Sequence, residues 1–256
     1  MPFRVPDLPS LIAREAGNRL FLRSMARLLP TRLAWIAPLA LAAACGGQEP
    51  SPRAQAAPLA AVLAQADGPG IAEIRAGDLS AARIGFEASL RADPDRMAAL
   101  NDLAVGYYLA GRVEAARQLL DEVLAHGEPP EQLAALVNLG ELCALEGYLT
   151  AAQAYLESAV GIDDARAEPR IALALLADAR GDPEATRLLR EAMRLDAGGE
   201  ARRTLVFAHP EGRLHLEALA AEAAGDRAAA ADRWRDLRAG RFPSLAAAAQ
   251  RHLESP

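Results

Sequence analysis

The sequence contains no lysine and has few of the residues that usually carry catalysis or metal binding. Its 256 residues include two cysteines, four histidines and three asparagines, and aromatic residues make up only 4 %. Cys45 and Cys143 are too far apart in the sequence to act as a zinc-ligand pair, and two cysteines do not make a disulfide scaffold. No GxSxG, HExxH, P-loop or GxGxxG pattern occurs. These absences argue against the common hydrolase, metalloprotease and nucleotide-binding classes.

The charge is negative and unevenly distributed. The whole chain has a net charge of −6, but residues 45–256 alone carry 22 arginines against 32 acidic residues. A chain this acidic repels phosphate backbones, so nucleic acid is not an expected partner. Alanine supplies 61 of the 256 residues, and because it favours helices and disfavours strands, the composition predicts a mainly helical protein.

The N-terminal region has the features of an export signal. Arg27 and Arg32 precede a 12-residue apolar stretch, residues 33–44, which ends in three alanines directly before Cys45. As a helix this stretch would rise about 18 Å, too little to cross a hydrocarbon core of about 30 Å. We therefore expect residues 1–44 to be a signal peptide. Residues 1–24 are either a long N-terminal extension of it or an over-extended start.

The residues around Cys45 resemble the lipobox of bacterial lipoproteins, in which the cysteine thiol receives a diacylglyceryl group. One position departs from the pattern, because Ala42 stands where leucine is usual. Ala42-x-Ala44 also fits ordinary signal-peptidase cleavage, so a soluble periplasmic protein is the alternative. Residues 45–60 are rich in Pro, Gly and Ala, which predicts a structureless tether. Gly46, where Asp would signal inner-membrane retention, favours the outer membrane.

A repeating pattern marked by five glycines occupies residues 61–256. The glycines lie 34, 36, 34 and 44 residues apart, at Gly77, Gly111, Gly147, Gly181 and Gly225. Small residues stand seven before and five after each glycine, and a large apolar or aromatic residue stands nine after, as with Gly140, Ala152 and Leu156. In the fourth unit Arg190 takes the large-residue position and Leu189 precedes it, which indicates a one-residue shift.

This pattern predicts two antiparallel helices per unit, joined by a tight turn at the glycine. Glycine tolerates the positive φ that such a turn requires. The small residues let two helices approach closely, and the large residue fills the space between one pair and the next. One pair cannot bury both of its faces, so the pairs are expected to stack.

The spacing and residue types resemble the tetratricopeptide repeat (TPR). The likeness is clearest in residues 100–124 (LNDLAVGYYLAGRVEAARQLLDEVL) and 136–160 (LVNLGELCALEGYLTAAQAYLESAV), and Pro94 matches the proline that closes many such repeats. The resemblance covers about residues 70–240 and implies an all-α, TPR-like α-solenoid of about five helix–turn–helix repeats. A C-terminal helix over residues 244–253 is expected to cap it.

Two places depart from the repeat pattern. Gly68-Pro69-Gly70 interrupts the first helix of the first unit, so that unit is half a repeat by sequence. About ten extra residues, around positions 204–213, lengthen the last interval.

In the TPR family the first helix of each pair lines a concave groove that receives a peptide or a partner helix. Counted from each repeat glycine, the resemblance places there Asn101, Val105, Tyr108, Val137, Glu141, Ile171, Leu175, Asp178, His215, Leu219 and Glu222. This surface lacks the Lys/Asn set that lets some TPR domains hold a C-terminal carboxylate. A partner segment with apolar anchors and basic flanks suits it best. Alternatively, several of the apolar residues simply pack between helices.

Other conspicuous residues favour structural roles. Cys143 lies among apolar residues and is expected to be a small buried side chain, while Phe86 and Trp234 fill the large-residue position of their units. His209 and His215 are six residues apart and do not share a helix face, so no metal site is expected. No cofactor is expected either.

Together these observations predict a non-enzymatic, lipid-anchored TPR adaptor on the periplasmic face of the outer membrane. Cys45 would attach it to the membrane, and a protein of the cell envelope would be its partner. Pilotins for type IV pilus secretins and adaptors for peptidoglycan enzymes have this architecture. The alternative is a soluble periplasmic small-ligand carrier, or a degenerate enzyme, that uses the insertion from His209 to His215. The two differ in whether that insertion folds over a closed pocket.

Overall fold

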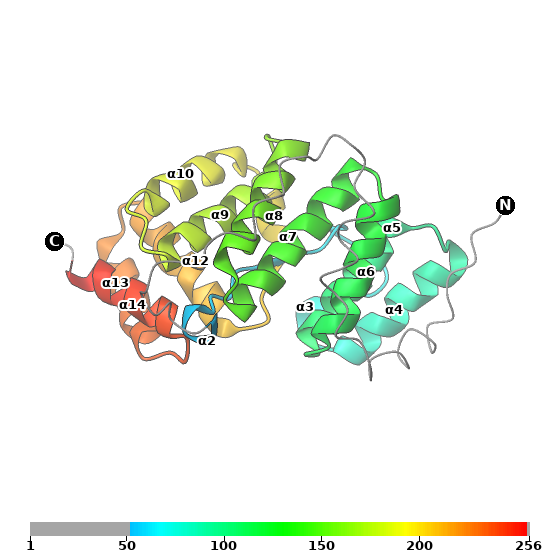
Figure 1. The fold of residues 1–256 in the computed structure, drawn as a ribbon, viewed down its shortest axis with the longest axis horizontal. Coiled ribbons are helices and arrows are strands. Elements are labelled where there is room, and N and C mark those ends of the chain that lie inside the picture. The colour runs from blue at the N-terminus through cyan, green and yellow to red at the C-terminus, as the bar shows by residue number, and fades with distance from the viewer. Residues whose placement is uncertain (1–51, 255–256) are drawn as a thin grey trace, which may run out of the picture. The chain divides into compact units, whose positions relative to one another are not determined.

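The computed structural model describes residues 52–254, and in this range the protein is all-α apart from two strands of two residues each (Figure 1). The predicted signal peptide, Cys45 and the first part of the predicted tether lie outside the described residues. Within residues 52–254, no helix combines the length and the hydropathy that crossing a bilayer requires.

The helices follow one another as five antiparallel pairs, which confirms the predicted fold class. The pairs are α3 (Ile71–Ala76) with α4 (Leu79–Ala92), α5 (Met97–Leu109) with α6 (Val113–His126), α7 (Pro129–Glu146) with α8 (Leu149–Ile162), α9 (Glu168–Ala179) with α10 (Ala185–Leu195), and α12 (Pro210–Ala223) with α13 (Arg227–Arg238). The other elements are α2 (Pro52–Gln55), β1 (Ala61–Val62), α11 (Glu200–Thr204), β2 (Leu205–Val206) and α14 (Pro243–Glu254).

All five repeat glycines have positive φ, as the spacing predicts. At the turn between α7 and α8, Gly147 has a φ of 86° and donates its N–H to the carbonyl of Ala144 at 3.0 Å. The N–H of Tyr148 bonds to the carbonyl of Cys143 at 2.8 Å, so two carbonyls at the helix end are satisfied. A β-carbon would strain this conformation, which is why the turn position is glycine.

The small and large positions of the repeat meet inside each unit. A β-carbon added to Gly140 would lie 3.0 Å from Cγ of Leu156 and 3.4 Å from the carbonyl oxygen of Ala152. In the first unit, a β-carbon on Gly70 would lie 2.7 Å from the ring of Phe86. The two helices of a unit therefore touch where the sequence pattern places its small residues.

The predicted irregularities of the pattern are also present. In α10 Leu189 is buried and Arg190 is exposed, which confirms the one-residue shift in the fourth unit. The helix α3 is only six residues long, because Gly68-Pro69-Gly70 precedes it directly. The predicted capping helix is α14, which packs against α13 and α9.

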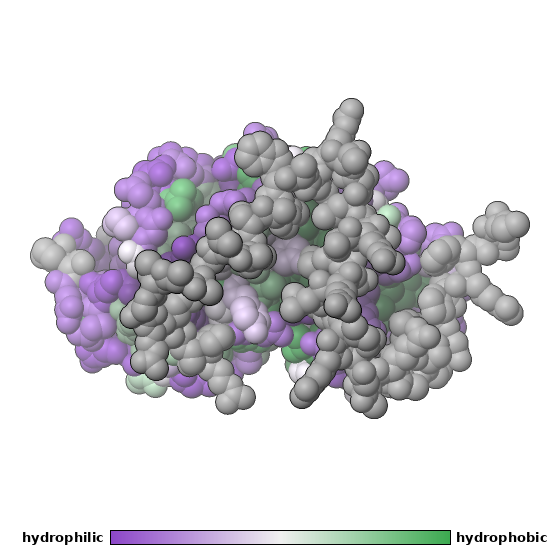
Figure 2. All heavy atoms as spheres, in the orientation of Figure 1, coloured by the Kyte–Doolittle hydropathy of each residue, from purple (hydrophilic) through white to green (hydrophobic). Residues whose placement is uncertain are grey.

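Hydrophilic residues predominate over α10, α13 and α14 on the face shown in Figure 2. By contrast, α5 is buried on all sides, with every residue from 99 to 108 shielded from solvent, whereas α4 buries only Ala82 and Phe86. A helix buried on all sides must be covered on the face that a free groove would leave open.

Part of the predicted tether covers this face of α5. Residues 45–60 were expected to be structureless, but Ala57 and Leu59 are 0 % and 1 % exposed, and burial continues without a break to Leu63. The expected domain boundary at residue 61 therefore lies within a packed segment. The physical reason is composition, because residues 54–66 carry no charge and consist mostly of alanine, leucine and valine, which gain free energy on burial.

Candidate functional site: an occupied inner surface

The strap, residues Ala56–Gln65, crosses the first helices of the second and third repeats. Figure 1 shows it in blue to cyan, running from α2 past α7. Its side chains join both apolar clusters of the domain, with Leu59 and Val62 in one and Leu63 in the other. The receiving surface consists of α5 and α7, and four of their polar side chains bind the strap.

Glu141 on α7 binds the first part of the strap. Its Oε2 accepts the N–H of Leu59 at 2.7 Å, and its Oε1 accepts a hydrogen bond from the hydroxyl of Tyr108 on α5. Burial raises the pKa of Glu141 to about 8, although both hydrogen bonds favour its charged form. Burial and the nearby carboxylate raise the pKa of Tyr108 well above its ordinary value. The structure thus brings together two residues that were predicted for the groove.

Asn138 binds both main-chain groups of Val62. Its Oδ1 accepts the N–H at 2.7 Å and its Nδ2 donates to the carbonyl at 2.9 Å. Asn101 on α5 donates to the same carbonyl at 3.1 Å, and its own Oδ1 accepts from Asn138 at 2.9 Å. The side-chain amide of Asn138 therefore pairs with both main-chain groups of Val62, as the main chain of a neighbouring β-strand would.

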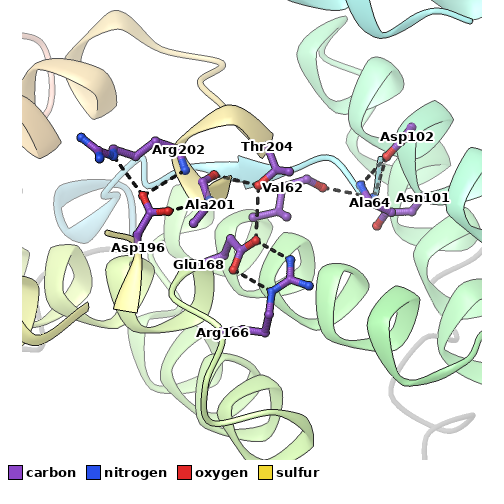
Figure 3. Close-up of polar contacts among 10 residues, drawn as sticks. All are labelled: Val62, Ala64, Asn101, Asp102, Arg166, Glu168, Asp196, Ala201, Arg202 and Thr204. Atoms are coloured by element: carbon purple, nitrogen blue, oxygen red, sulfur yellow. Dashed lines mark hydrogen bonds and ion pairs between the residues drawn. The ribbon is translucent and has the colours of Figure 1, made fainter. Parts of the chain in front are cut away.

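Asp102 binds the last part of the strap. Its Oδ1 accepts the N–H of Ala64 at 2.6 Å and its Oδ2 accepts from the side chain of Gln65 at 3.0 Å. Figure 3 shows Asp102 and Asn101, both on α5, beside Ala64 of the strap. Asp102 is 0 % exposed, and this burial raises its pKa to about 6 against the effect of its hydrogen bonds.

The insertion before the fifth repeat covers the strap from the opposite side. We call residues 200–206, which form α11 and β2, the lid. The strands pair antiparallel, with Ala61 opposite Val206 and Val62 opposite Leu205, and Leu63 donates its N–H to the carbonyl of Thr204 at 2.9 Å. The insertion thus folds over the strap, and the strap lies between the lid and the inner helices.

Two buried carboxylates hold the lid in place (Figure 3). Glu168 accepts a hydrogen bond from the hydroxyl of Thr204 at 3.4 Å and from Nε of Arg166 at 3.1 Å. Asp196 forms an ion pair with Nε of Arg202 at 2.9 Å. The bonds from Thr204 to Glu168 and from the N–H of Ala201 to Asp196 are buried, whereas the arginines that pair with these carboxylates, Arg166 and Arg202, are partly exposed.

Three other residues predicted for the groove belong to a separate polar cluster. Asp178, His215 and Glu222 lie with Trp234 and His252 in what we call the C-terminal cluster. Asp178 bonds to Nε2 of His215 and to Nε2 of His252, both at 2.7 Å, and Nδ1 of His252 lies 2.8 Å from Glu222. The rings of Trp234 and His252 are stacked, with centroids 4.3 Å apart.

Charge pairing controls ionisation in the C-terminal cluster. Burial opposes the charged form of Asp178, but the hydrogen bonds from His215 and His252 outweigh it and hold the pKa of that carboxyl well below its usual range. Burial also disfavours charged His252, yet its bonds to Asp178 and Glu222 raise its pKa to about 9. Among the described residues, no group of three or more His, Cys, Asp and Glu side chains is arranged to hold a metal ion.

The remaining predicted groove residues are apolar and buried. They are Val105, Val137, Ile171, Leu175 and Leu219. His209 lies at the start of α12, where its ring contacts Phe242 and Arg241, whereas His215 is buried in the C-terminal cluster. The two histidines of the insertion therefore have different surroundings.

Sequence reasoning missed Asn138 and Asp102, which make the most direct contacts with the strap. Each stands nine residues before a repeat glycine, so they occupy equivalent positions in successive repeats. Two signals were available. Asn138 and Asn101 are two of only three asparagines in the chain, and both stand within strongly apolar helices, where a polar side chain needs a partner.

The helix pairs and their turns define a helical-repeat protein with a TPR-like arrangement. No protein-family model matches the chain, and no curated protein sequence matches it. Among solved structures, the chain is similar to a crystal structure of MamA, with 19 % sequence identity and a TM-score of 0.40. That alignment covers 71 % of this chain and 95 % of the other. The fold assignment rests on the helix pairs described above.

Proposed function

We propose that the protein is a non-enzymatic scaffold of the bacterial cell envelope that binds an extended segment of another protein along α5 and α7. One observation carries this proposal: buried side chains of the inner helices bind the main chain of a protein segment, at Leu59, Val62 and Ala64. Contacts of this kind recognise an extended backbone, as when a peptide adds to a sheet edge.

The membrane attachment in this proposal is a lipid on Cys45, at the periplasmic face of the outer membrane. Its support comes from the arginines, the short apolar stretch and the small residues that precede the cysteine. A soluble periplasmic protein is the alternative. In both cases the domain that binds the partner is the helical repeat, and the process that it serves is set by the partner.

The rival function, a small-ligand carrier or degenerate enzyme, has less support. It needs the insertion from His209 to His215 to contribute a ligand site. Part of the insertion instead pairs with the strap, and His215 is hydrogen-bonded to Asp178. Its Nδ1 has no hydrogen-bond partner within the described residues, but the side chain is fully buried.

Metabolic labelling tests the lipid anchor. A fatty-acid analogue should label the wild-type chain and Cys143→Ser, whereas Cys45→Ser should remain unlabelled and should leave the membrane fraction. Cys143 is the matched control because it is the other cysteine of the chain and is buried. Equal labelling of all three proteins would exclude Cys45 as the lipid site.

Photo-crosslinking in native envelopes tests the scaffold role. A photoreactive residue at Ala66, at the exposed end of the strap, should give one discrete crosslinked protein. The same residue at Ile84, which is 57 % exposed on α4, is the control and should not give that product. Crosslinks that are absent at both positions, or the same at both, would contradict a partner bound along α5 and α7.

A further inference from the structure

We propose that the strap is a displaceable occupant of the binding surface, and that the partner is an uncharged extended segment of small and aliphatic residues that takes its place. This inference rests on the proposed function and deepens it. The protein would carry its own competitor, so that the surface is closed to weak ligands and open to a segment that matches the strap.

The contacts that hold the strap are available to other segments of the same shape. Most are made to main-chain groups, which every non-proline residue possesses, and the side chains that enter the core are alanine, leucine and valine. Specificity then comes from spacing, because N–H groups are needed at three positions that follow the order of Leu59, Val62 and Ala64. It comes also from size, because the lid leaves the strap buried on both sides.

The receiving surface requires an occupant. Asn101, Asp102, Asn138 and Glu141 are almost completely buried beneath the strap. Without a bound segment, the apolar residues that pack under the strap would be exposed to water together with these polar groups, and exposure of apolar surface is unfavourable. Exchange of one segment for another avoids that penalty, so we expect replacement of the strap rather than an empty surface.

The strap is bounded by elements that can open without separating the helix pairs. Residues 66–69, which connect it to α3, are exposed and include Gly68 at a φ of 121°. The lid that covers it comprises a five-residue helix and a two-residue strand. Short, partly exposed elements of this kind belong to the part of a structure that opens before the core.

Covalent attachment gives the strap an advantage over a free segment. A segment joined through a short linker has an effective concentration of the order of 1 mM. A free peptide of equal intrinsic affinity, present at about 1 μM, would therefore occupy only about one surface in a thousand. Cutting the connection removes this advantage, which makes the proposal measurable.

The experiment uses the full chain with a site-specific protease sequence inserted between Ala66 and Pro69. After cleavage, we expect a fluorescent peptide of residues 54–66 (AQAAPLAAVLAQA) to bind with an apparent Kd about 1,000-fold lower than in the uncut protein. A control peptide with Leu59→Asp and Val62→Asp should not bind. In the protein, Asn138→Ala should weaken peptide binding about 5- to 150-fold, whereas Gln153→Ala on α8, whose side chain bonds to Glu157 and Arg180 and not to the strap, should have no effect.

Hydrogen exchange of the uncut wild-type chain provides a second measurement that needs no variant. The main-chain N–H groups of Leu59, Val62 and Ala64 should exchange faster than that of Leu142 in α7, because the strap opens before the repeats unfold. Equal rates for the strap and α7 would show that the strap leaves only when the whole domain unfolds, and would overturn the proposal.

Three other outcomes would also overturn it. Retention of the cut strap without exchange, with the helices still folded, would make it a permanent part of the core. Release of the strap only together with loss of helical circular dichroism would make it necessary for the fold. Formation of dimers by the cut chain that the strap peptide dissociates would identify a second copy as the occupant. Failure of the lipid labelling or of the envelope crosslinking bears on the proposed function, and peptide exchange is measured independently of both.

Discussion

The strap site and the C-terminal cluster both use buried carboxylates on inner helices, but the carboxylates ionise in opposite ways. In the strap site the pKa values of Asp102 and Glu141 are raised, to about 6 and about 8, because burial removes water and no cation replaces it. In the C-terminal cluster the pKa values of Asp178 and Glu222 are lowered, because imidazoles offset their burial.

This difference corresponds to two tasks: the strap site binds the main chain of a segment, and the C-terminal cluster links helices to one another. Main-chain N–H groups are neutral donors, so their hydrogen bonds only partly offset the cost of burying a charged carboxylate. Every non-proline residue carries such a group, so another segment can replace the bound one. Imidazole side chains supplied by α12 and α14 bond to Asp178 and link these helices to α9, and the raised pKa of His252 keeps that ring protonated at neutral pH. The same repeat architecture therefore holds a main-chain segment on its second and third repeats and a paired polar cluster between α9, α12 and α14.

The largest expected effect comes from removing Asp178. Asp178→Ala would leave His215 and His252 buried without their shared acceptor, and the free energy of unfolding should fall by about 3–5 kcal/mol. Urea titration measures this loss, and hydrogen exchange of the strap should change less than that of α14. Asp178→Asn is the matched control, because it keeps the size and one acceptor oxygen and should cost less.

A smaller loss is expected from Asn138→Ala, which leaves the N–H of Val62 without its acceptor. One buried main-chain donor without a partner costs about 1–3 kcal/mol, while the carbonyl of Val62 keeps its bond from Asn101. The effect should be concentrated in the strap, whose amide exchange should accelerate most. If α14 lost protection equally, the two regions would not be separable.

Gly140→Leu tests the packing that both regions share. The new side chain would meet Leu156 at the contact between α7 and α8, and overpacking of this kind costs about 1–3 kcal/mol. Ala152→Leu should behave alike, while Glu157→Leu on the exposed face of α8 should not lower the melting temperature. Equal melting temperatures for all three variants would mean that the repeat spacing has been assigned wrongly.

A pH dependence, which develops gradually over several pH units, is also expected. Because the pKa of Glu141 is raised from 4.5 to about 8, the folded protein binds more protons than the unfolded chain between these values. The free energy of unfolding should therefore fall as pH rises, by up to about 1.4 kcal/mol per pH unit for this group between pH 6 and 8.

Glu141→Gln should remove this part of the slope while keeping an acceptor for Leu59, and denaturant titrations at several pH values measure the difference. His252 contributes in a neighbouring window, because its raised pKa gives stability that is present below pH 6.5 and is lost as pH rises through about 9. Asp178 acts oppositely, since its lowered pKa gives stability that is lost in acid. An unchanged slope in Glu141→Gln would show that this carboxyl does not titrate in that range.

The repeat architecture could be predicted from the sequence because its signals are local. Gly140, Ala152 and Leu156 stand at fixed distances from one turn glycine, and they meet within one helix pair. The shift at Leu189 could be predicted for the same reason. Local spacing determines these contacts, and no distant part of the chain is needed to explain them.

The strap could not be predicted in this way. Leu59 and Glu141 are 82 residues apart, and residues 54–66 show neither helical nor alternating periodicity. Their high alanine content, interrupted by Pro58, is equally typical of a linker. Only the all-round apolar character of α5 indicated that something covers it, and it did not indicate what.

The position of the strap determines how far the domain can lie from a lipid anchor at Cys45. With a lipid on Cys45, six residues, 46–51, separate the anchor from α2, which packs against α7 and α14, and this connection spans at most about 25 Å. Release of the strap together with α2 would extend the connection to residue 69 and its largest span to about 80 Å. A partner that displaces the strap would thereby both occupy the domain and let it travel farther from the membrane, so binding and distance would be coupled in one movement.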